Sequence, residues 1–113
     1  MNVRVKFLQE RDFMVQLENC SGEHLLIDTD AVMQLDQETL EILRITNELD
    51  CINLNSDATY FVFGEKAQMA LETLQNFNCS EIYCLTGDFN AIGNEVFAIQ
   101  LMKHHHENNM ASK

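Results

Sequence analysis

Apolar residues near the N-terminus recur with the two-residue period of a β-strand. Residues 3–7 alternate apolar with basic side chains and predict a half-buried strand. Residues 12–17 also show an alternating pattern, and the polar residues 9–11 indicate a turn, so the two segments predict an antiparallel hairpin. His24–Asp28 is apolar at consecutive positions, which is typical of a central strand covered on both faces.

The rest of the chain alternates between helical and strand-like patterns. Apolar residues at helical spacing predict helices over residues 37–49, 65–77 and 89–103. Aromatic and β-branched residues predict strands over Thr59–Phe63 and Glu81–Leu85. The order of elements is therefore β-β-β-α-β-α-β-α with short connections. This order indicates an α/β fold with a mixed, mostly parallel central sheet and helices packed against it.

The length and the C-terminal tail determine the expected domain organisation. A chain of 113 residues is expected to form one domain, because it can build a single hydrophobic core but not two. We assign this domain to residues 1–103. Residues 104–113 are polar and predict an unstructured tail, and the three adjacent histidines at its start are not assigned as a metal site.

The chain is strongly acidic, with 18 Asp and Glu residues against 7 Lys and Arg residues and a formal net charge of −11. Nucleic-acid binding requires basic residues that neutralise phosphates, so a direct DNA or RNA ligand is excluded. The acidity can serve solubility, attract a basic patch on a protein partner, or imitate a nucleic-acid backbone. No apolar run approaches the roughly 18 residues of a membrane span, and the N-terminus lacks a signal-peptide pattern. We therefore expect a cytoplasmic protein with no membrane insertion.

Sequence motifs that carry catalytic chemistry are missing. There is no nucleophile elbow, phosphate-binding loop or paired-histidine zinc motif. The four cysteines form no CxxC pair and have no basic neighbours, so we expect reduced and mostly buried thiols. They are Cys20, Cys51, Cys79 and Cys84. A pair of Cys84 with His24 is left open, but the sequence as a whole predicts a protein that is not an enzyme and needs no cofactor or metal.

The most informative segment is residues 26–43, which read Leu-Ile-Asp-Thr-Asp-Ala-Val-Met-Gln-Leu-Asp-Gln-Glu-Thr-Leu-Glu-Ile-Leu. It predicts a buried strand that ends at Asp28, followed by a turn that Val32 and Leu35 hold inward. An amphipathic helix then begins after Asp36, whose carboxylate can act as its N-cap. In this register the segment resembles the central motif of STAS domains, the family of anti-sigma-factor antagonists.

The STAS resemblance covers roughly residues 24–103 and implies a regulatory domain that binds other proteins without catalysing a reaction. The family carries a phosphorylatable serine where this chain has Gln37, and glutamine cannot accept a phosphoryl group. The resemblance therefore implies that partner binding is constitutive or controlled elsewhere. The family's helix between its second and third strands is also missing, because only residues 18–23 fill that gap.

The same resemblance implies a docking surface at the turn and the start of the helix. Its residues are Asp30, Asp36, Gln37, Glu38, Thr39 and Glu41. The expected partner is a regulatory protein, either an anti-sigma-type kinase or a transporter component, or a second copy of this chain. A missing covering helix would leave apolar surface that such self-association can bury.

Two other interpretations remain open. Residues 82–92 resemble the closing strand and turn of rhodanese-like sulfurtransferases, but residues 63–66 hold no cysteine where that family carries its persulfide cysteine. This resemblance implies a degenerate domain that binds without catalysis. Alternatively, the chain is a small acidic inhibitor that mimics nucleic acid, which requires carboxylates spaced like phosphates on one face.

Overall fold

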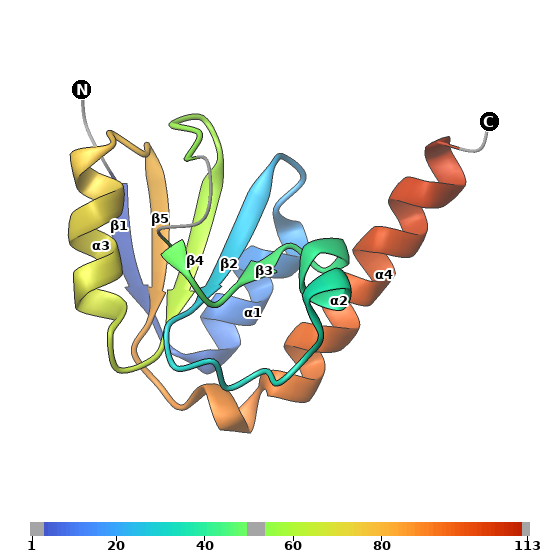
Figure 1. Ribbon diagram of the computed structural model, residues 1–113, viewed down its shortest axis with the longest axis horizontal. Coiled ribbons are helices and arrows are strands. Elements are labelled where there is room, and N and C mark those ends of the chain that lie inside the picture. Colours follow the sequence, from blue (N-terminus) through green and yellow to red (C-terminus); the bar gives the residue numbers. More distant parts are fainter. Residues whose placement is uncertain (1–3, 50–53, 112–113) are drawn as a thin grey trace.

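The computed structural model describes residues 4–49 and 54–111, with side chains up to residue 107. Its strands are β1 (Arg4–Leu8), β2 (His24–Asp28), β3 (Ile45–Thr46), β4 (Thr59–Phe63) and β5 (Glu81–Leu85). Its helices are α1 (Glu10–Asn19), α2 (Gln37–Ile42), α3 (Ala67–Asn76) and α4 (Gly93–Ala111), with a 3-10 helix η2 (Phe89–Ala91) before α4. Within the described residues, five parallel strands form one sheet in the order β1-β5-β4-β2-β3 (Figure 1). The predicted α/β class with a parallel sheet is confirmed, as is the helix predicted over residues 65–77.

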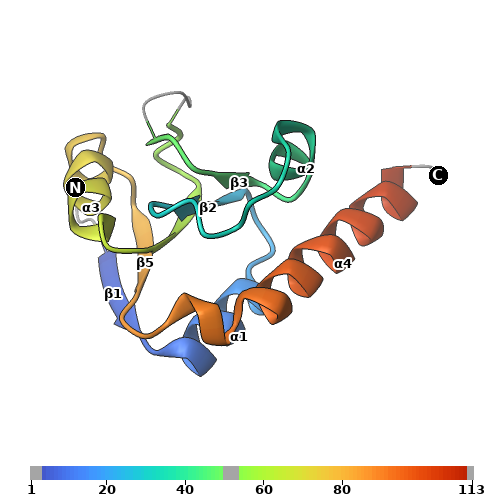
Figure 2. The same ribbon diagram turned by 60° about the horizontal axis from the view of Figure 1, so that its bottom comes forward.

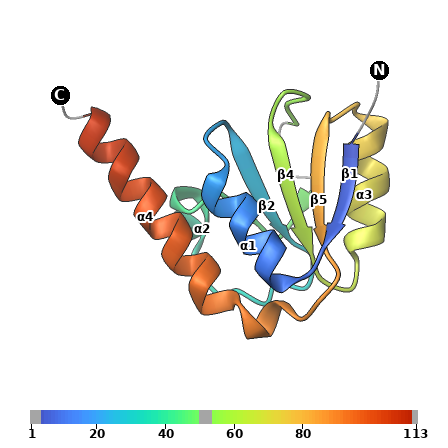
Figure 3. The same ribbon diagram turned by 180° about the vertical axis from the view of Figure 1, so that it is seen from behind.

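Helices cover both faces of the sheet (Figures 2 and 3). α1, α2 and α4 pack on one face, whereas α3 packs on the other. Successive strand residues point to opposite faces, so Phe61 and Phe63 of β4 join the first core while Tyr60 and Val62 join the second. Phe63 also stacks on Phe89 of η2 with ring centroids 3.7 Å apart, which ties the end of the sheet to the segment that leads into α4.

Residues 12–17 belong to α1, so the predicted antiparallel hairpin is wrong. Phe13 and Leu17 are fully buried at 0% exposure, whereas Val15 between them is 43% exposed. Residues four apart share one face of a helix, while a strand would have turned all three side chains to the same side. α1 instead connects β1 to the parallel strand β2, so the predicted run of three consecutive strands is replaced by β-α-β.

α2 is shorter than the helix predicted over residues 37–49. It ends at Ile42, and Arg44 then takes a left-handed backbone conformation with φ 57°. The β-branched pair Ile45–Thr46 follows as the short strand β3 beside β2. Cys51 lies among residues 50–53, outside the described part of the chain.

α4 continues through Ala111, so residues 104–111 are helical where the sequence predicted an unstructured tail. Two polar contacts join the C-terminal half of α4 to the body of the protein. Arg44 pairs with Glu107 at 2.9 Å, and the ammonium group of Lys103 donates to the carbonyl oxygen of Cys20. The helix therefore extends past the predicted domain boundary at residue 103.

The sheet has a topological switch point between β2 and β4. After β2 the chain passes through α2 to β3 on one side, and after β4 it passes through α3 to β5 on the other. Open α/β sheets usually bind ligands outside the carboxyl ends of their strands at such a point. In this fold, that place is formed by the residues that follow Asp28 and Phe63.

Candidate functional site

The carboxyl end of β2 is organised around the carboxylate of Asp28, which is fully buried. Its two oxygens accept hydrogen bonds from the backbone N–H groups of Val32 (3.0 Å) and Met33 (2.8 Å). A buried carboxylate requires such donors, because a charge without partners away from water is costly. Asp28 thus holds the following loop in shape, and its predicted place at the end of the strand is confirmed.

The switch point is closed by side chains of this loop. The carboxylate of Asp30 accepts a hydrogen bond from the backbone N–H of Glu65 at 2.8 Å. Oγ1 of Thr29 accepts one from the backbone N–H of Lys66 at 3.2 Å. Gly64 permits this approach, because a Cβ at that position would lie 2.1 Å from Oγ1 of Thr29. Backbone N–H groups before a helix can bind anions, but these two are already paired within the chain.

The start of α2 carries the other residues of the predicted docking surface. Asp36 is the N-cap of α2: its carboxylate accepts a hydrogen bond from the backbone N–H of Thr39 at 2.7 Å, and this bond lowers the pKa of Asp36. One turn of helix separates Gln37 from Glu41, and Nε2 of Gln37 donates to the carboxylate of Glu41 at 3.4 Å. The side chains of Gln37, Glu38 and Glu41 are exposed. The predicted N-cap is confirmed.

The six predicted docking residues do not form one group. Asp30 pairs with the backbone before α3, whereas the other five belong to the N-cap and first turns of α2. Asp30 and Asp36 are both engaged in hydrogen bonds that shape the backbone, and Thr39 is half-buried. The exposed polar surface that remains for a partner consists of Gln37, Glu38 and Glu41.

A groove of about 290 Å³ runs beside the loop that leads into α2. Its lining comes from this loop, from η2 and from the start of α4: Val32, Met33, Leu35, Phe89, Asn90, Gly93, Asn94 and Phe97. Leu35 packs partly on the core as predicted, but Val32 is 37% exposed and does not hold the turn inward. Sequence reasoning missed the groove, because its two walls lie far apart in the chain.

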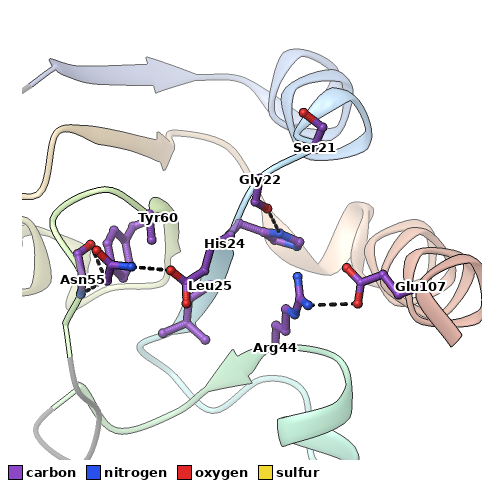
Figure 4. A pocket seen from close by; sticks show the side chains of 10 residues that line it. Ser21, Gly22, His24, Leu25, Arg44, Asn55, Tyr60 and Glu107 are labelled. Carbon is purple, nitrogen blue, oxygen red and sulfur yellow. Dashed lines mark hydrogen bonds and ion pairs between the residues drawn. The ribbon is translucent and has the colours of Figure 1, made fainter. Parts of the chain in front are cut away.

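A larger cavity of about 620 Å³ opens where β2 and β4 begin, at the other end of the sheet (Figure 4). It is lined by Ser21, Gly22, Glu23, His24, Leu25, Arg44, Asn55, Ala58, Tyr60 and Glu107. The guanidinium of Arg44 pairs with the carboxylate of Glu107 at 2.9 Å beside the ring of His24. On another wall, the hydroxyl of Tyr60 donates to the carbonyl oxygen of Asn55 at 3.1 Å. Sequence reasoning missed this cavity, because it placed Arg44 inside a helix.

His24 is buried beside this cavity and is held neutral. Its Nε2 accepts a hydrogen bond from Nε2 of Gln100 at 3.0 Å, and the same amide donates to the carbonyl oxygen of Leu43 at 2.8 Å. The second bond fixes the orientation of the amide, so Nδ1 of His24 carries the proton and donates to the carbonyl oxygen of Gly22 at 3.2 Å. Burial lowers the pKa of His24 more than its hydrogen bonds raise it. His24 thus joins β2 to α4 as a neutral ring.

Two of the described thiols, those of Cys79 and Cys84, are buried where nucleophilic chemistry is unfavourable. Burial raises the pKa of Cys79 and of Cys84, which keeps both thiols protonated. Cys84 packs on the α3 face of the sheet, whereas His24 lies against Phe61 on the opposite face. The sheet therefore separates the cysteine and histidine whose pairing the sequence left open. No group of three or more His, Cys, Asp or Glu side chains that could hold a metal ion occurs in the described parts of the chain.

No known protein family matches the chain, and it has no significant match among curated proteins or solved structures. The STAS and rhodanese resemblances therefore stay predictions, as does the cytoplasmic location. Among the described residues, no helix combines the length and the apolar character that crossing a membrane requires.

Proposed function

We propose that this protein is a non-catalytic regulatory module that binds a basic, amphipathic helix of a partner protein. The binding surface, called here the acidic docking surface, consists of Gln37, Glu38 and Glu41 together with the groove beside the loop before α2. The proposal rests on the observation that the acidic residues of α2 and the groove form one continuous surface. The loop that lines the groove ends at Leu35 and runs directly into the N-cap and acidic first turn of α2.

The two parts of the acidic docking surface match the two faces of such a helix. An amphipathic helix binds by laying its apolar side chains into a groove. Val32 offers exposed apolar surface there, and the flexible side chain of Met33 can adapt to different partners. Glu38 and Glu41 attract Lys and Arg on the other face of the helix. The net charge of −11 also steers a basic partner toward the chain.

The STAS resemblance supports a regulatory role for this surface and suggests an anti-sigma-type kinase or a transporter component as the partner. A second copy of this acidic chain is a poorer match to the surface, because like charges would meet. Phosphorylation is not the switch. Gln37 has no hydroxyl, and Thr39 is hydrogen-bonded through its side chain and its backbone to Asp36, where a phosphate would face a carboxylate.

Charge reversal on α2 tests the proposal. The probe is a short, fluorescently labelled helical peptide with Leu on one face and Lys on the other, and binding is measured by anisotropy. We expect Glu38→Lys/Glu41→Lys to weaken binding by about tenfold, because each exposed ion pair contributes up to about 1 kcal/mol. Glu65→Lys/Glu72→Lys is the matched control, since it changes the net charge equally near the start of α3 and on its exposed face.

The control separates a defined surface from a general effect of charge. We expect the control variant to bind within about twofold of the wild-type protein, because the ion pairs at the docking surface are kept. An equal loss in both double variants would show that only net charge matters. The groove is tested by Val32→Ser, which removes exposed apolar surface and is expected to weaken binding several-fold. A wild-type chain that does not bind the peptide at low ionic strength would contradict the proposal.

A further inference from the structure

The cavity at the amino ends of β2 and β4 has the size of a small-molecule site. Its volume of about 620 Å³ falls within the range of about 300–1,000 Å³ that is typical of ligand pockets. Leu25, Ala58 and Tyr60 supply apolar and aromatic wall, and Arg44 supplies a positive charge. The cavity shares no residue with the acidic docking surface, so a ligand site there does not depend on the proposed function.

Arg44 occupies a backbone position that suits another type of residue. It directly follows the C-cap of α2, and its φ of 57° is left-handed. Glycine is favoured at this position of a helix end because it has no Cβ, and asparagine is tolerated because its short polar side chain can hydrogen-bond locally. The equivalent position after α3 follows the rule, since it is Asn78 with φ 58°. The unfavourable backbone conformation of Arg44 therefore indicates that its side chain makes an interaction that glycine or asparagine could not make.

The ion pair between Arg44 and Glu107 is too weak to be that interaction. Among the described residues, its side chain bonds to Glu107 at 2.9 Å, and the two side chains are 38% and 48% exposed. Ion pairs this exposed add little to stability. The contact also uses a single nitrogen, Nη2, although a guanidinium can hold a carboxylate by two parallel N–H···O bonds.

We propose that this cavity binds a small organic carboxylate, and that the ligand's carboxylate takes the place of the Glu107 carboxylate on Arg44. Glu107, carried by the end of α4, is the internal occupant that leaves when the ligand binds. The apolar part of the ligand lies against Leu25 and Tyr60, whose side chains Figure 4 shows in the wall of the cavity. A monocarboxylate fits better than a phosphate, because Glu23 in the lining repels an anion of higher charge more strongly.

An NMR titration of the full ¹⁵N-labelled chain tests this site. The probes are propionate and benzoate, with propionamide and benzamide as uncharged analogues of the same shape. We expect the carboxylates to shift the backbone resonances of His24, Leu25 and Arg44 until saturation, with millimolar dissociation constants. The amides should bind about tenfold more weakly, because they lack the charge that Arg44 holds. Inorganic phosphate that binds as tightly as the carboxylates would overturn the assignment.

Two variants give opposite expectations. Arg44→Gly removes the guanidinium and relieves the left-handed backbone, so the chain keeps its fold while carboxylate affinity falls about tenfold. Glu107→Gln removes the internal occupant and raises the affinity by up to about fivefold, the effect of losing one exposed ion pair. Asn78→Gly makes the equivalent backbone change after α3 and leaves the affinity unchanged. The proposal is overturned if Arg44→Gly binds as the wild type does, or if neither the wild type nor Glu107→Gln saturates.

Discussion

Replacement of Gly64 by alanine is expected to force open the closed switch point between β2 and β4. The φ of Gly64 is 113°, and an added Cβ would lie 2.1 Å from Oγ1 of Thr29 and 3.0 Å from Cγ of Asp30. A contact of 2.1 Å cannot be kept, so Thr29 or the backbone must move. Movement of Thr29 breaks the bond that it donates to the carbonyl oxygen of Phe63 (2.9 Å) and the bond that it accepts from Lys66 (3.2 Å).

The loss of stability follows from two contributions. Forcing a residue with a Cβ into such a backbone conformation costs about 1–3 kcal/mol. Each of the two hydrogen bonds of Thr29 contributes about 1 kcal/mol to the free energy of unfolding. The expected total is therefore about 3–5 kcal/mol. Set against the roughly 5–15 kcal/mol that keep a typical domain folded, this is a large effect for one methyl group.

Urea unfolding followed by circular dichroism measures this loss as a shift in midpoint at constant slope. Gly22→Ala is the control, because a Cβ there meets nothing within 4 Å, and we expect it to stay within about 0.5 kcal/mol of the wild type. The double variant Thr29→Ala/Gly64→Ala removes the closest contact, so it should lose less than the sum of the single variants. A loss below about 1 kcal/mol for Gly64→Ala, or strict additivity in the double variant, would refute this reasoning.

Two further predictions concern the cap of α2 and the buried histidine. Asp36→Ala should lower the melting temperature by a few degrees, whereas Asp36→Asn, which keeps an accepting oxygen, should stay close to the wild type. An equal fall in melting temperature in both variants would assign the effect to the charge of Asp36 instead. Burial lowers the pKa of His24 below its ordinary 6.5, so the neutral ring contributes stability above that pH, and this contribution is lost as the pH falls toward the folded-state pKa. As the pH falls below about 6.5, the free energy of unfolding should therefore decrease more steeply in the wild type than in His24→Gln, by up to about 1.4 kcal/mol per pH unit. Parallel curves of unfolding free energy against pH for the two proteins would contradict a neutral His24.

Elements whose local pattern agrees with their burial could be predicted from the sequence. β4 is a run of aromatic and β-branched residues between the two cores, and α3 buries residues at helical spacing on one face. α1 could not be predicted, because Phe13, Val15 and Leu17 also fit a strand, and only packing against the sheet distinguishes the two. β3 has two residues and thus no period of its own, so it depends on pairing with β2.

The candidate sites could be predicted only where their contacts are local. The N-cap of α2 joins residues three apart, and the sequence identified it. Asp30 was predicted for the docking surface, yet its partner is the backbone before α3, in a different part of the chain. The cavity depends on α4, which brings Gln100 to His24 and Glu107 to Arg44 across the fold. Because the sequence predicted that this helix ends at residue 103, it could not indicate the contact between Glu107 and Arg44.

The central claim is that the acidic docking surface binds a basic, amphipathic helix. Its most direct test is an NMR footprint of the Leu/Lys peptide on the ¹⁵N-labelled chain at two salt concentrations. We expect shifts over residues 32–42 and 89–97, little change over Ala67–Asn76 on the opposite face, and weaker binding at the higher salt concentration. Shifts centred on another surface, or an affinity that does not respond to salt, would contradict the claim.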